Sequence, residues 1–166
     1  MVNCVFTSHG IHVPAIDLWL DSLEPVAANW ISHAHRDHAQ PGHGRVWATP
    51  QTMRMYLTRS PEASGSLLRE VELRESWEWN GARLTAYPAG HILGAAQLLI
   101  EFAGERLVYT GDIKLRPPML GEAAEALECD QLTIESTLDF PSITFWIVRL
   151  QSSGSNNSRG NVCPMG

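Results

Sequence analysis

The segment Ser32-His33-Ala34-His35-Arg36-Asp37-His38 constrains this chain more than any other part of its sequence, because it places three imidazoles and one carboxylate close together. Neutral imidazole nitrogens and carboxylate oxygens are ligands that zinc accepts readily. A packed core would gain nothing from such a cluster, since every buried polar group would need a hydrogen-bond partner. The segment therefore predicts metal binding.

The position of this cluster in the chain favours two metal ions rather than one. It follows an apolar run, residues 30–32, that we predict to be a strand. On a loop that leaves a strand, His33 and His35 can converge on one ion while Asp37 and His38 turn toward a second. Two ions about 3.5–4 Å apart suit the displacement of a leaving oxygen by an attacking one.

Two later motifs supply further candidate ligands. His91 lies after a predicted strand and between Gly90 and Gly94, which allow a close approach of the backbone. Asp112 ends the run Tyr109-Thr110-Gly111-Asp112, and a carboxylate can bridge two cations. Either motif alone is equally typical of a turn, but after the histidine cluster both predict ligands. We interpret the remaining histidines as ordinary core or surface residues: His9, His12 and His43.

The chain is expected to form one layered α/β domain with helices packed on sheet. Thr49 and Pro50 predict a helix from 50 to about 59, and an alanine-rich stretch predicts another over 119–127. Residues 60–66 are predicted as a loop, and 103–105 as a hairpin turn. The predicted strands are 2–6, 16–20, 30–32, 45–47, 83–87, 97–102, 106–110 and 132–134.

Composition limits the partners that the chain can bind. The formal net charge of -6 argues against a broad electrostatic grip on a polyanion, so metal ions or a missing segment must attract any nucleic-acid substrate. The three cysteines have no C-x-x-C spacing, which indicates neither a disulfide framework nor a thiolate zinc site. No apolar run approaches the ~20 residues of a membrane span, and the N-terminus shows no signal peptide. We expect a cytoplasmic protein without a membrane partner.

The histidine cluster, then His91, then Asp112 in Thr-Gly-Asp, resembles the metallo-β-lactamase superfamily. The run Leu132-Thr133-Ile134-Glu135-Ser136-Thr137 is similar to the acidic motif that opens the β-CASP nuclease branch. Residues 40–50 and 88–91 are similar to the bacterial ligase-associated DNA exonucleases, also labelled mRNA 3′-end processing factors. The resemblance covers about residues 10–137.

The resemblance implies a site with two zinc ions, for which manganese is an alternative. It implies that one ion is held by His33, His35 and His91, that the other is held by Asp37 and His38, and that Asp112 bridges them. It also implies an aspartate that orients the ligands, for which we favour Asp17 over Asp21. Glu135 matches the first acidic residue of the nuclease branch and is expected to support a ligand or a histidine on the phosphate side.

The chain also departs from the family pattern. Family members continue past the Glu-Ser-Thr segment through a β-CASP cap to C-terminal histidines, one of which completes the second zinc site. This chain has no histidine after His91, and its last residues resemble nothing in the family. We therefore expect residues 1–141 to be the N-terminal part of a truncated metallo-β-lactamase-like domain. We expect 142–166 to be an unrelated, disordered tail, because 152–160 is a polar low-complexity run.

The predicted function is zinc-dependent hydrolysis of a nucleic-acid phosphodiester, with Asp37, Asp112 and Glu135 as catalytic residues. Asp37 is the best candidate to accept a proton from the attacking water. The resemblance favours DNA over RNA and a DNA-repair exonuclease that works with a DNA ligase or helicase of the same pathway. Three alternatives stay open: an RNA 3′-end processing nuclease, a hydrolase of thioesters, lactones or β-lactams on the same fold, and an inactive zinc-binding remnant. Without the cap, we expect the chain to be a slow nuclease.

Overall fold

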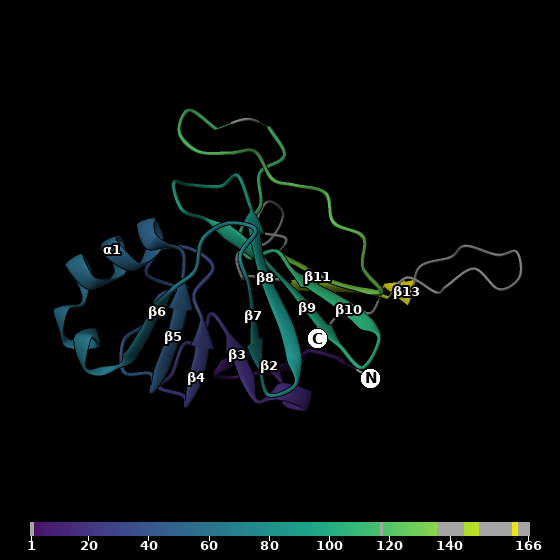
Figure 1. Ribbon diagram of the computed structural model, residues 1–166, viewed down its shortest axis with the longest axis horizontal. Coiled ribbons are helices and arrows are strands. Elements are labelled where there is room, and N and C mark those ends of the chain that lie inside the picture. Colours follow the sequence, from purple (N-terminus) through teal and green to yellow (C-terminus); the bar gives the residue numbers. More distant parts are fainter. Residues whose placement is uncertain (1, 117, 136–144, 150–160, 163–166) are drawn as a thin grey trace, which may run out of the picture.

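Two β-sheets and one α-helix make up the part of the chain that the computed structural model describes, which is residues 2–116, 118–135, 145–149 and 161–162 (Figure 1). The helix and the first sheet lie on one side of the view, and the second sheet lies on the other. The layered α/β architecture predicted from the sequence is confirmed.

The first sheet has six strands in chain order, β1-β2-β3-β4-β5-β6. The pairs β1/β2 and β2/β3 are antiparallel, whereas β3/β4, β4/β5 and β5/β6 are parallel. Parallel neighbours end at the same edge of a sheet, so the loops after β3, β4 and β5 emerge together. The strand bounds are β1 Val5–Thr7, β2 Gly10–Val13, β3 Leu18–Leu20, β4 Ala28–Trp30, β5 Arg45–Ala48 and β6 Leu67–Glu70.

The second sheet has seven strands in the order β13-β12-β11-β10-β9-β8-β7. Neighbouring strands are antiparallel except β10 and β11, which are parallel. The bounds are β7 Ser76–Trp79, β8 Ala82–Pro88, β9 Ala96–Phe102, β10 Glu105–Tyr109, β11 Gln131–Glu135, β12 Phe145–Arg149 and β13 Asn161–Val162. Ala103 and Gly104, both with positive φ, form the predicted hairpin turn between β9 and β10.

The main core lies between the two sheets. Leu18, Leu20 and Trp30 of the first sheet share one fully buried cluster with Leu84 and Leu98 of the second. Successive residues of a strand point to opposite faces, so β5 directs Trp47 into this core and Val46 to the other face. Burial of apolar area between the two sheets fixes their relative position. It thereby also fixes where the loops at the strand ends lie.

Helix α1, Pro50–Arg59, covers the outer face of the first sheet. It begins as predicted: Thr49 is the N-cap, its hydroxyl accepts the Thr52 N–H, and Pro50 takes the first helical position. Met53 and Tyr56 are fully buried against Ile31 and Val46. The loop predicted over 60–66 contains the short 3-10 helix η2, Pro61–Gly65.

The predicted helix over 119–127 is wrong, because the described residues of this stretch form no helix. Their backbone donors go to distant carbonyls instead: the Ala124 N–H bonds the Lys114 carbonyl at 3.3 Å and the Glu125 N–H bonds the Pro88 carbonyl at 3.2 Å. Part of the segment between β10 and β11 forms the loop at the top of Figure 1. Tertiary hydrogen bonds therefore override the helical propensity of its alanines.

Other predicted elements are shifted or were missed. The strand predicted over 16–20 is divided into the 3-10 helix η1, Pro14–Ile16, and β3, because Asp17 adopts a left-handed conformation with φ 47°. The strand predicted over 30–32 ends at Trp30, since the Ser32 N–H bonds a carboxylate of Asp21 rather than a strand. Strands β2, β6 and β7 were not predicted. Each of them has only four residues, which is too short for a sequence pattern to separate it from a loop.

Two strands lie within the tail predicted to be disordered, namely β12 and β13, which pair with each other and, through β12, with β11. The rest of 142–166, including the polar run 152–160, lies outside the described residues. The domain boundary at 141 therefore stays a prediction. Among the described helices none is long and apolar enough to cross a membrane.

Gly94 joins the two layers beside the predicted ligand His91. Its carbonyl accepts hydrogen bonds from the hydroxyls of Thr49 and Thr52 at 2.6 and 3.0 Å, which fasten this loop to the start of α1. With φ +84°, a Cβ at Gly94 would lie 2.8 Å from the Gln51 Cβ and 2.9 Å from the Thr52 nitrogen.

We predict that Gly94→Ala lowers the free energy of unfolding by at least about 1–2 kcal/mol, because strain at positive φ adds to this overlap. Urea denaturation measures the loss. Gly65→Ala is the matched control, since a Cβ there meets nothing within 4 Å, and it should stay within about 0.5 kcal/mol of wild type. Equal stability of the two variants would contradict the proposed anchoring.

Candidate metal centre

The predicted ligands come from strand ends of both sheets. The histidine cluster follows β4, His91 follows β8, Asp112 follows β10, and Asp21 follows β3. The two sheets are joined at this edge by a hydrogen bond of 2.9 Å from the Ala96 N–H to the Ser32 carbonyl. Packing between the sheets therefore brings together residues that are up to 91 positions apart in the sequence, from Asp21 to Asp112.

The histidine loop is held rigidly from both ends. The Ile31 N–H bonds the Trp47 carbonyl at 3.0 Å, and the Ala39 N–H closes a turn onto the His35 carbonyl at 3.0 Å. Arg59, at the end of α1, donates from its guanidinium to the Ala34 and Ala39 carbonyls. These bonds fix the backbone of the loop on both sides of the cluster.

Four of the predicted ligands form one compact donor set: His33, His35, His91 and Asp112. His35 Nδ1 lies 2.9 Å from His33 Nε2 and 3.2 Å from His91 Nε2. Asp112 Oδ2 lies 3.2 Å from His91 Nε2 and 3.7 Å from His33 Nε2. Ligands at 2.0–2.1 Å from a tetrahedral zinc are separated by about 3.3 Å, so this donor set fits one such ion.

A second donor set shares the Asp112 carboxylate. His38 Nε2 lies 3.2 Å from Asp112 Oδ1 and 3.7 Å from Asp37 Oδ2. The two oxygens of Asp112 therefore face different histidines, with Oδ2 toward the first set and Oδ1 toward His38. This is the arrangement that a carboxylate needs to bridge two cations, as the resemblance implied for Asp112.

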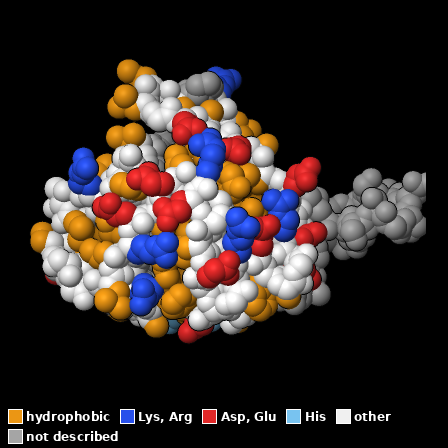
Figure 2. Space-filling model, in the orientation of Figure 1, with side chains coloured by type: hydrophobic (Ala, Val, Ile, Leu, Met, Phe, Trp, Pro, Cys, Tyr) orange, Lys and Arg blue, Asp and Glu red, His pale blue; other side chains and the backbone are white. Residues whose placement is uncertain are grey.

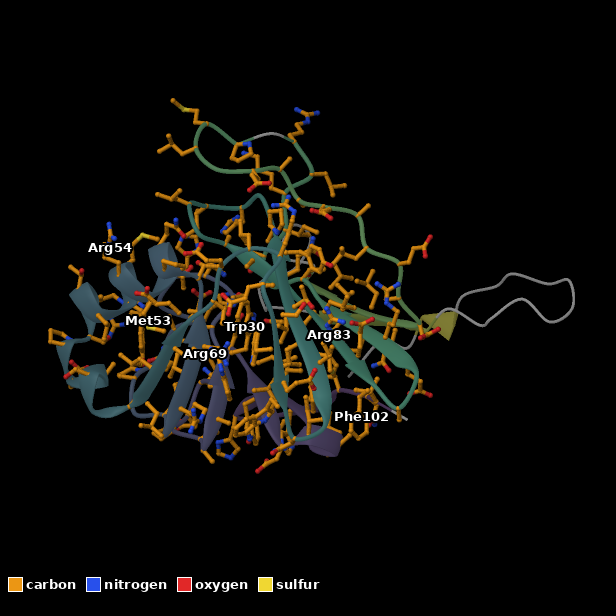
Figure 3. The ribbon with its side chains drawn as sticks, viewed as in Figure 1. Trp30, Met53, Arg54, Arg69, Arg83 and Phe102 are labelled. Carbon is orange, nitrogen blue, oxygen red and sulfur yellow. The ribbon has the colours of Figure 1, made fainter. Side chains whose placement is uncertain are left out.

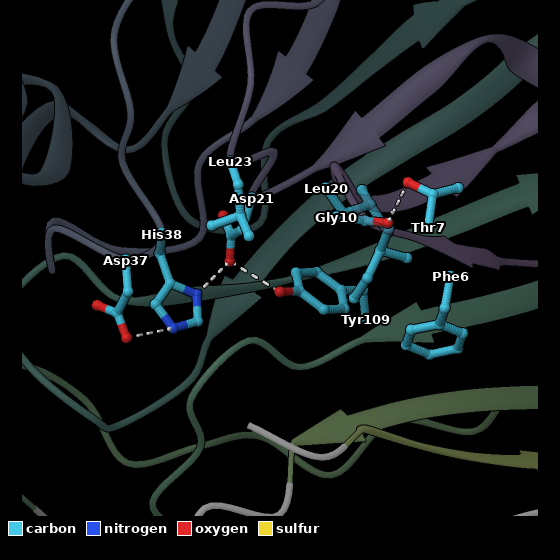
Figure 4. Close-up of a pocket in the computed structure, with 10 residues that line it drawn as sticks. Phe6, Thr7, Gly10, Leu20, Asp21, Leu23, Asp37, His38 and Tyr109 are labelled. Atoms are coloured by element: carbon cyan, nitrogen blue, oxygen red, sulfur yellow. Dashed lines mark hydrogen bonds and ion pairs between the residues drawn. The ribbon is translucent and has the colours of Figure 1, made fainter. Parts of the chain in front are cut away.

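The buried carboxylate of Asp21 orients histidines of both sets, and Figure 4 shows its contacts with His38 and Tyr109. Asp21 Oδ2 accepts from His38 Nδ1 at 2.8 Å, from the Tyr109 hydroxyl at 2.8 Å and from Ser32 Oγ, while Oδ1 accepts the Ser32 N–H at 2.7 Å. Ser32 Oγ also lies 3.0 Å from His33 Nδ1. With protons on the Nδ1 atoms of both rings, His33 and His38 turn their Nε2 lone pairs toward the donor sets.

Asp17, which the sequence analysis favoured for this orienting role, lies elsewhere. It is 70% exposed, and its carboxylate bonds His12 Nε2 at 3.0 Å on the surface. The left-handed turn at Asp17 precedes β3, whereas Asp21 follows β3 at the edge where the ligands meet. The two aspartates therefore lie at opposite ends of one strand, and the structure brings Asp21 to the cluster.

Burial and neighbouring charges set the protonation of the histidines in the metal-free chain. Burial lowers the pKa of His33 to about 4 and also lowers the pKa of His91. Burial opposes the charged form of His38 as well, but hydrogen bonds and charges of Asp112 and Asp21 outweigh it and raise the pKa of His38 to about 11. The site thus already stabilises a positive charge at His38, the position where a cation would replace the proton.

Glu135 is the last residue of β11, and its backbone pairs with Phe145. Its side chain lies outside what the structure describes, so its predicted catalytic role stays a prediction. Sequence patterns alone did not indicate Ser32, Arg59 and Tyr109, which position the histidine loop and Asp21 through hydrogen bonds. The signal for Tyr109 was available, since it stands at the end of a predicted strand directly before the Thr-Gly-Asp motif.

Comparison with known proteins places this site in a family. Residues 1–143 match the model of the beta-lactamase superfamily domain. The chain belongs to the β-lactamase superfamily. The metallo-β-lactamase-like fold expected from the histidine cluster is thereby confirmed.

Three relatives narrow the placement within the superfamily. A probable DNA ligase of Opitutus terrae is 31% identical over 140 residues, which cover 83% of this chain and 14% of that protein. Cleavage and polyadenylation specificity factor subunit 3 of Dictyostelium discoideum is 30% identical over 164 residues, which cover 80% of this chain and 20% of that protein. Endoribonuclease YSH1 of Mycosarcoma maydis is 34% identical over 129 residues, which cover 57% of this chain and 15% of that protein.

The chain therefore spans at most 20% of the length of these relatives. They are β-CASP family members, so the predicted relationship to that branch of the superfamily is confirmed.

We predict that His35→Ala removes at least one zinc ion per chain, because the compact donor set loses the nitrogen that lies between His33 and His91. Zinc content is measured by mass spectrometry of dialysed protein. His9→Ala, which removes an exposed histidine outside the cluster, should keep the wild-type content. A chelator should lower the melting temperature of wild type more than that of His35→Ala. Unchanged zinc content in His35→Ala would contradict the assignment of this donor set.

We predict that Tyr109→Phe weakens the second metal position more than the first, because Asp21 loses a donor and holds His38 less firmly. The loss of a buried hydrogen bond to a carboxylate should also lower the free energy of unfolding by about 1–3 kcal/mol. Burial and the Asp21 charge raise the pKa of Tyr109 well above its ordinary value, so its hydroxyl stays a donor at every pH used.

Tyr56→Phe is the control for this experiment, since the buried Tyr56 hydroxyl bonds the Gln40 carbonyl at 3.1 Å away from the cluster. It should lose stability but keep both zinc affinities, as measured by competition with a fluorescent chelator. Equal zinc affinities in both variants would contradict an orienting role for Tyr109.

Proposed function

We propose that this site is the two-zinc centre of a nucleic-acid phosphodiesterase, and that DNA is its substrate in an exonuclease reaction of DNA repair. The observation that carries this proposal is the Asp112 carboxylate, whose two oxygens face two separate histidine-containing donor sets. Two metal ions held by these donor sets would supply positive charge to the attacking and leaving oxygens of a phosphodiester. The donors are nitrogen and oxygen, which zinc and manganese both accept.

The relatives support nucleic acid over other substrates of the fold. One is named a probable DNA ligase, and another is named an endoribonuclease. The first name, together with the loop resemblance of residues 40–50 and 88–91, favours DNA and a pathway shared with a DNA ligase or helicase. The second favours RNA 3′-end processing as the alternative. A cytoplasmic location belongs to the same proposal.

In this reaction the residues of the chain position the reactants and move a proton. Bound metal ions supply the positive charge that activates water and neutralises the phosphate. Asp37 is the proton acceptor: its carboxylate is 57% exposed and lies 3.7 Å from His38 Nε2, so attacking water can reach Oδ2. Asp21 keeps His33 and His38 in place throughout, because it is buried and accepts four hydrogen bonds.

We predict that the chain with zinc or manganese hydrolyses bis(4-nitrophenyl) phosphate and end-labelled single-stranded DNA, and that His33→Ala or a chelator abolishes both activities. Turnover should be slow, because the chain has 18 acidic residues and only 12 basic ones. It therefore attracts the DNA strand only weakly and positions it poorly. His9→Ala is the matched control and should retain wild-type rates.

The same assays separate the alternatives. A matched RNA oligonucleotide tests RNA processing, and a chromogenic β-lactam, a lactone and a glutathione thioester test the other hydrolases of the fold. Hydrolysis of one of these three substrates without hydrolysis of any phosphodiester would overturn the proposal. Zinc binding with no hydrolysis of any substrate would indicate a zinc-binding remnant.

A further inference from the structure

Few cations are available on this chain to attract a polyanion. The sequence has 12 basic residues, and a single one of them is a lysine, Lys114. Lys114 stands two positions after Asp112, the residue that faces both donor sets. Its placement therefore bears on how a phosphodiester could be held beside the metal centre.

Four of the described arginines already have partners. Arg69 pairs with Glu75 at 3.1 Å, and Arg74 pairs with Glu122 at 2.6 Å. Arg106 lies 3.6 Å from Glu101. The guanidinium of Arg59 is used by two backbone carbonyls of the histidine loop. These side chains stabilise the protein surface or the loop, so their charges are partly compensated within the chain.

Lys114 differs from these arginines. Its side chain is exposed, and it forms no ion pair within the part of the chain that the structure describes. An ammonium group on a flexible stem is a strong point charge that finds phosphate oxygens without a fixed geometry. Lys114 therefore offers an uncompensated cation.

The backbone of Lys114 is fixed next to the His91 loop. Its N–H bonds the Ala89 carbonyl at 2.9 Å, and its carbonyl accepts the Ala124 N–H at 3.3 Å. That carbonyl also packs against Gly90, where a Cβ would overlap with it. Gly90 directly precedes His91. The lysine stem thus starts from a rigid position at the rim of the metal centre.

We propose that the Lys114 ammonium binds a non-bridging phosphate oxygen of the nucleic-acid backbone and so positions the substrate at the metal centre. This inference rests on the proposed function, since it requires a phosphodiester substrate. Contacts to phosphate fix the register of a strand without reading its sequence. Lys114 is therefore a positioning residue that raises affinity for any single strand alike.

The test is binding of a fluorescein-labelled single-stranded dT12 to the zinc-loaded full chain, followed by fluorescence anisotropy within the first minute of mixing, before slow turnover cleaves the strand. Lys114→Ala should weaken binding about tenfold at low salt, as expected for loss of one charged hydrogen bond. The slope of log affinity against log salt should fall by about 0.7, the value for one phosphate contact on a single strand. Lys114→Arg should keep most of the affinity.

Arg54→Ala is the matched control, because it removes the same charge from an exposed side chain on α1 (Figure 3). It should change the affinity less than twofold. Charged side chains of both signs are scattered over the face shown in Figure 2, so a loss in Lys114→Ala alone would reflect position and not net charge.

A second measurement is possible because Lys114 is the single lysine of the sequence. An amine-specific acetylating reagent, followed by peptide mass spectrometry, should modify Lys114 more slowly when dT12 is present, with the N-terminal amine as internal reference. Undiminished dT12 binding by Lys114→Ala, an equal loss in Arg54→Ala, or no protection of Lys114 would each overturn the inference while leaving phosphodiester hydrolysis intact. A wild-type chain that neither binds dT12 nor hydrolyses a phosphodiester would overturn the proposed function as well.

Discussion

The buried carboxylate of Asp21 is the group on which the metal centre depends. It accepts hydrogen bonds from His38, Tyr109 and both the backbone and the hydroxyl of Ser32. These donors come from the ends of β4 and β10 and from the histidine loop, while Asp21 itself follows β3. An ionised carboxylate is costly to bury without such partners. The same four bonds therefore offset the burial of Asp21 and hold strand ends from both sheets in register.

This arrangement explains how a small chain can build a polar site at the edge of an apolar core. The side chains that touch the core are apolar up to the last strand residues, Leu20 and Trp30 in the first sheet. The polar residues begin immediately afterwards, where the backbone leaves the sheets. Because strands of both sheets end at this edge, few additional contacts are needed to bring the histidines and carboxylates into the two donor sets. The hydrogen bond from Ala96 to Ser32 closes the same edge.

Electrostatics at the site contrast with those of the whole chain. The net charge is -6, and carboxylates surround His38 closely enough to raise its pKa to about 11. This negative potential favours the binding of metal cations. It disfavours the binding of a polyanionic substrate until the cations are in place. A phosphodiester therefore needs local positive charge to reach the site. Lys114, whose backbone is fixed beside the His91 loop, can supply it.

The sequence by itself determined the residue types of the candidate ligands, their order in the chain and the α/β class. Three histidines and an aspartate at one strand end predict a metal site, and Thr49-Pro50 sets the start of α1 through local capping chemistry. The tertiary structure alone decided what local patterns do not encode. It selected Asp21 over Asp17, because only the end of β3 that carries Asp21 meets the end of β10. It also replaced the helix predicted at 119–127 by an irregular segment, since the backbone donors of Ala124 and Glu125 found carbonyls on Lys114 and Pro88, residues near in space and not at helical spacing.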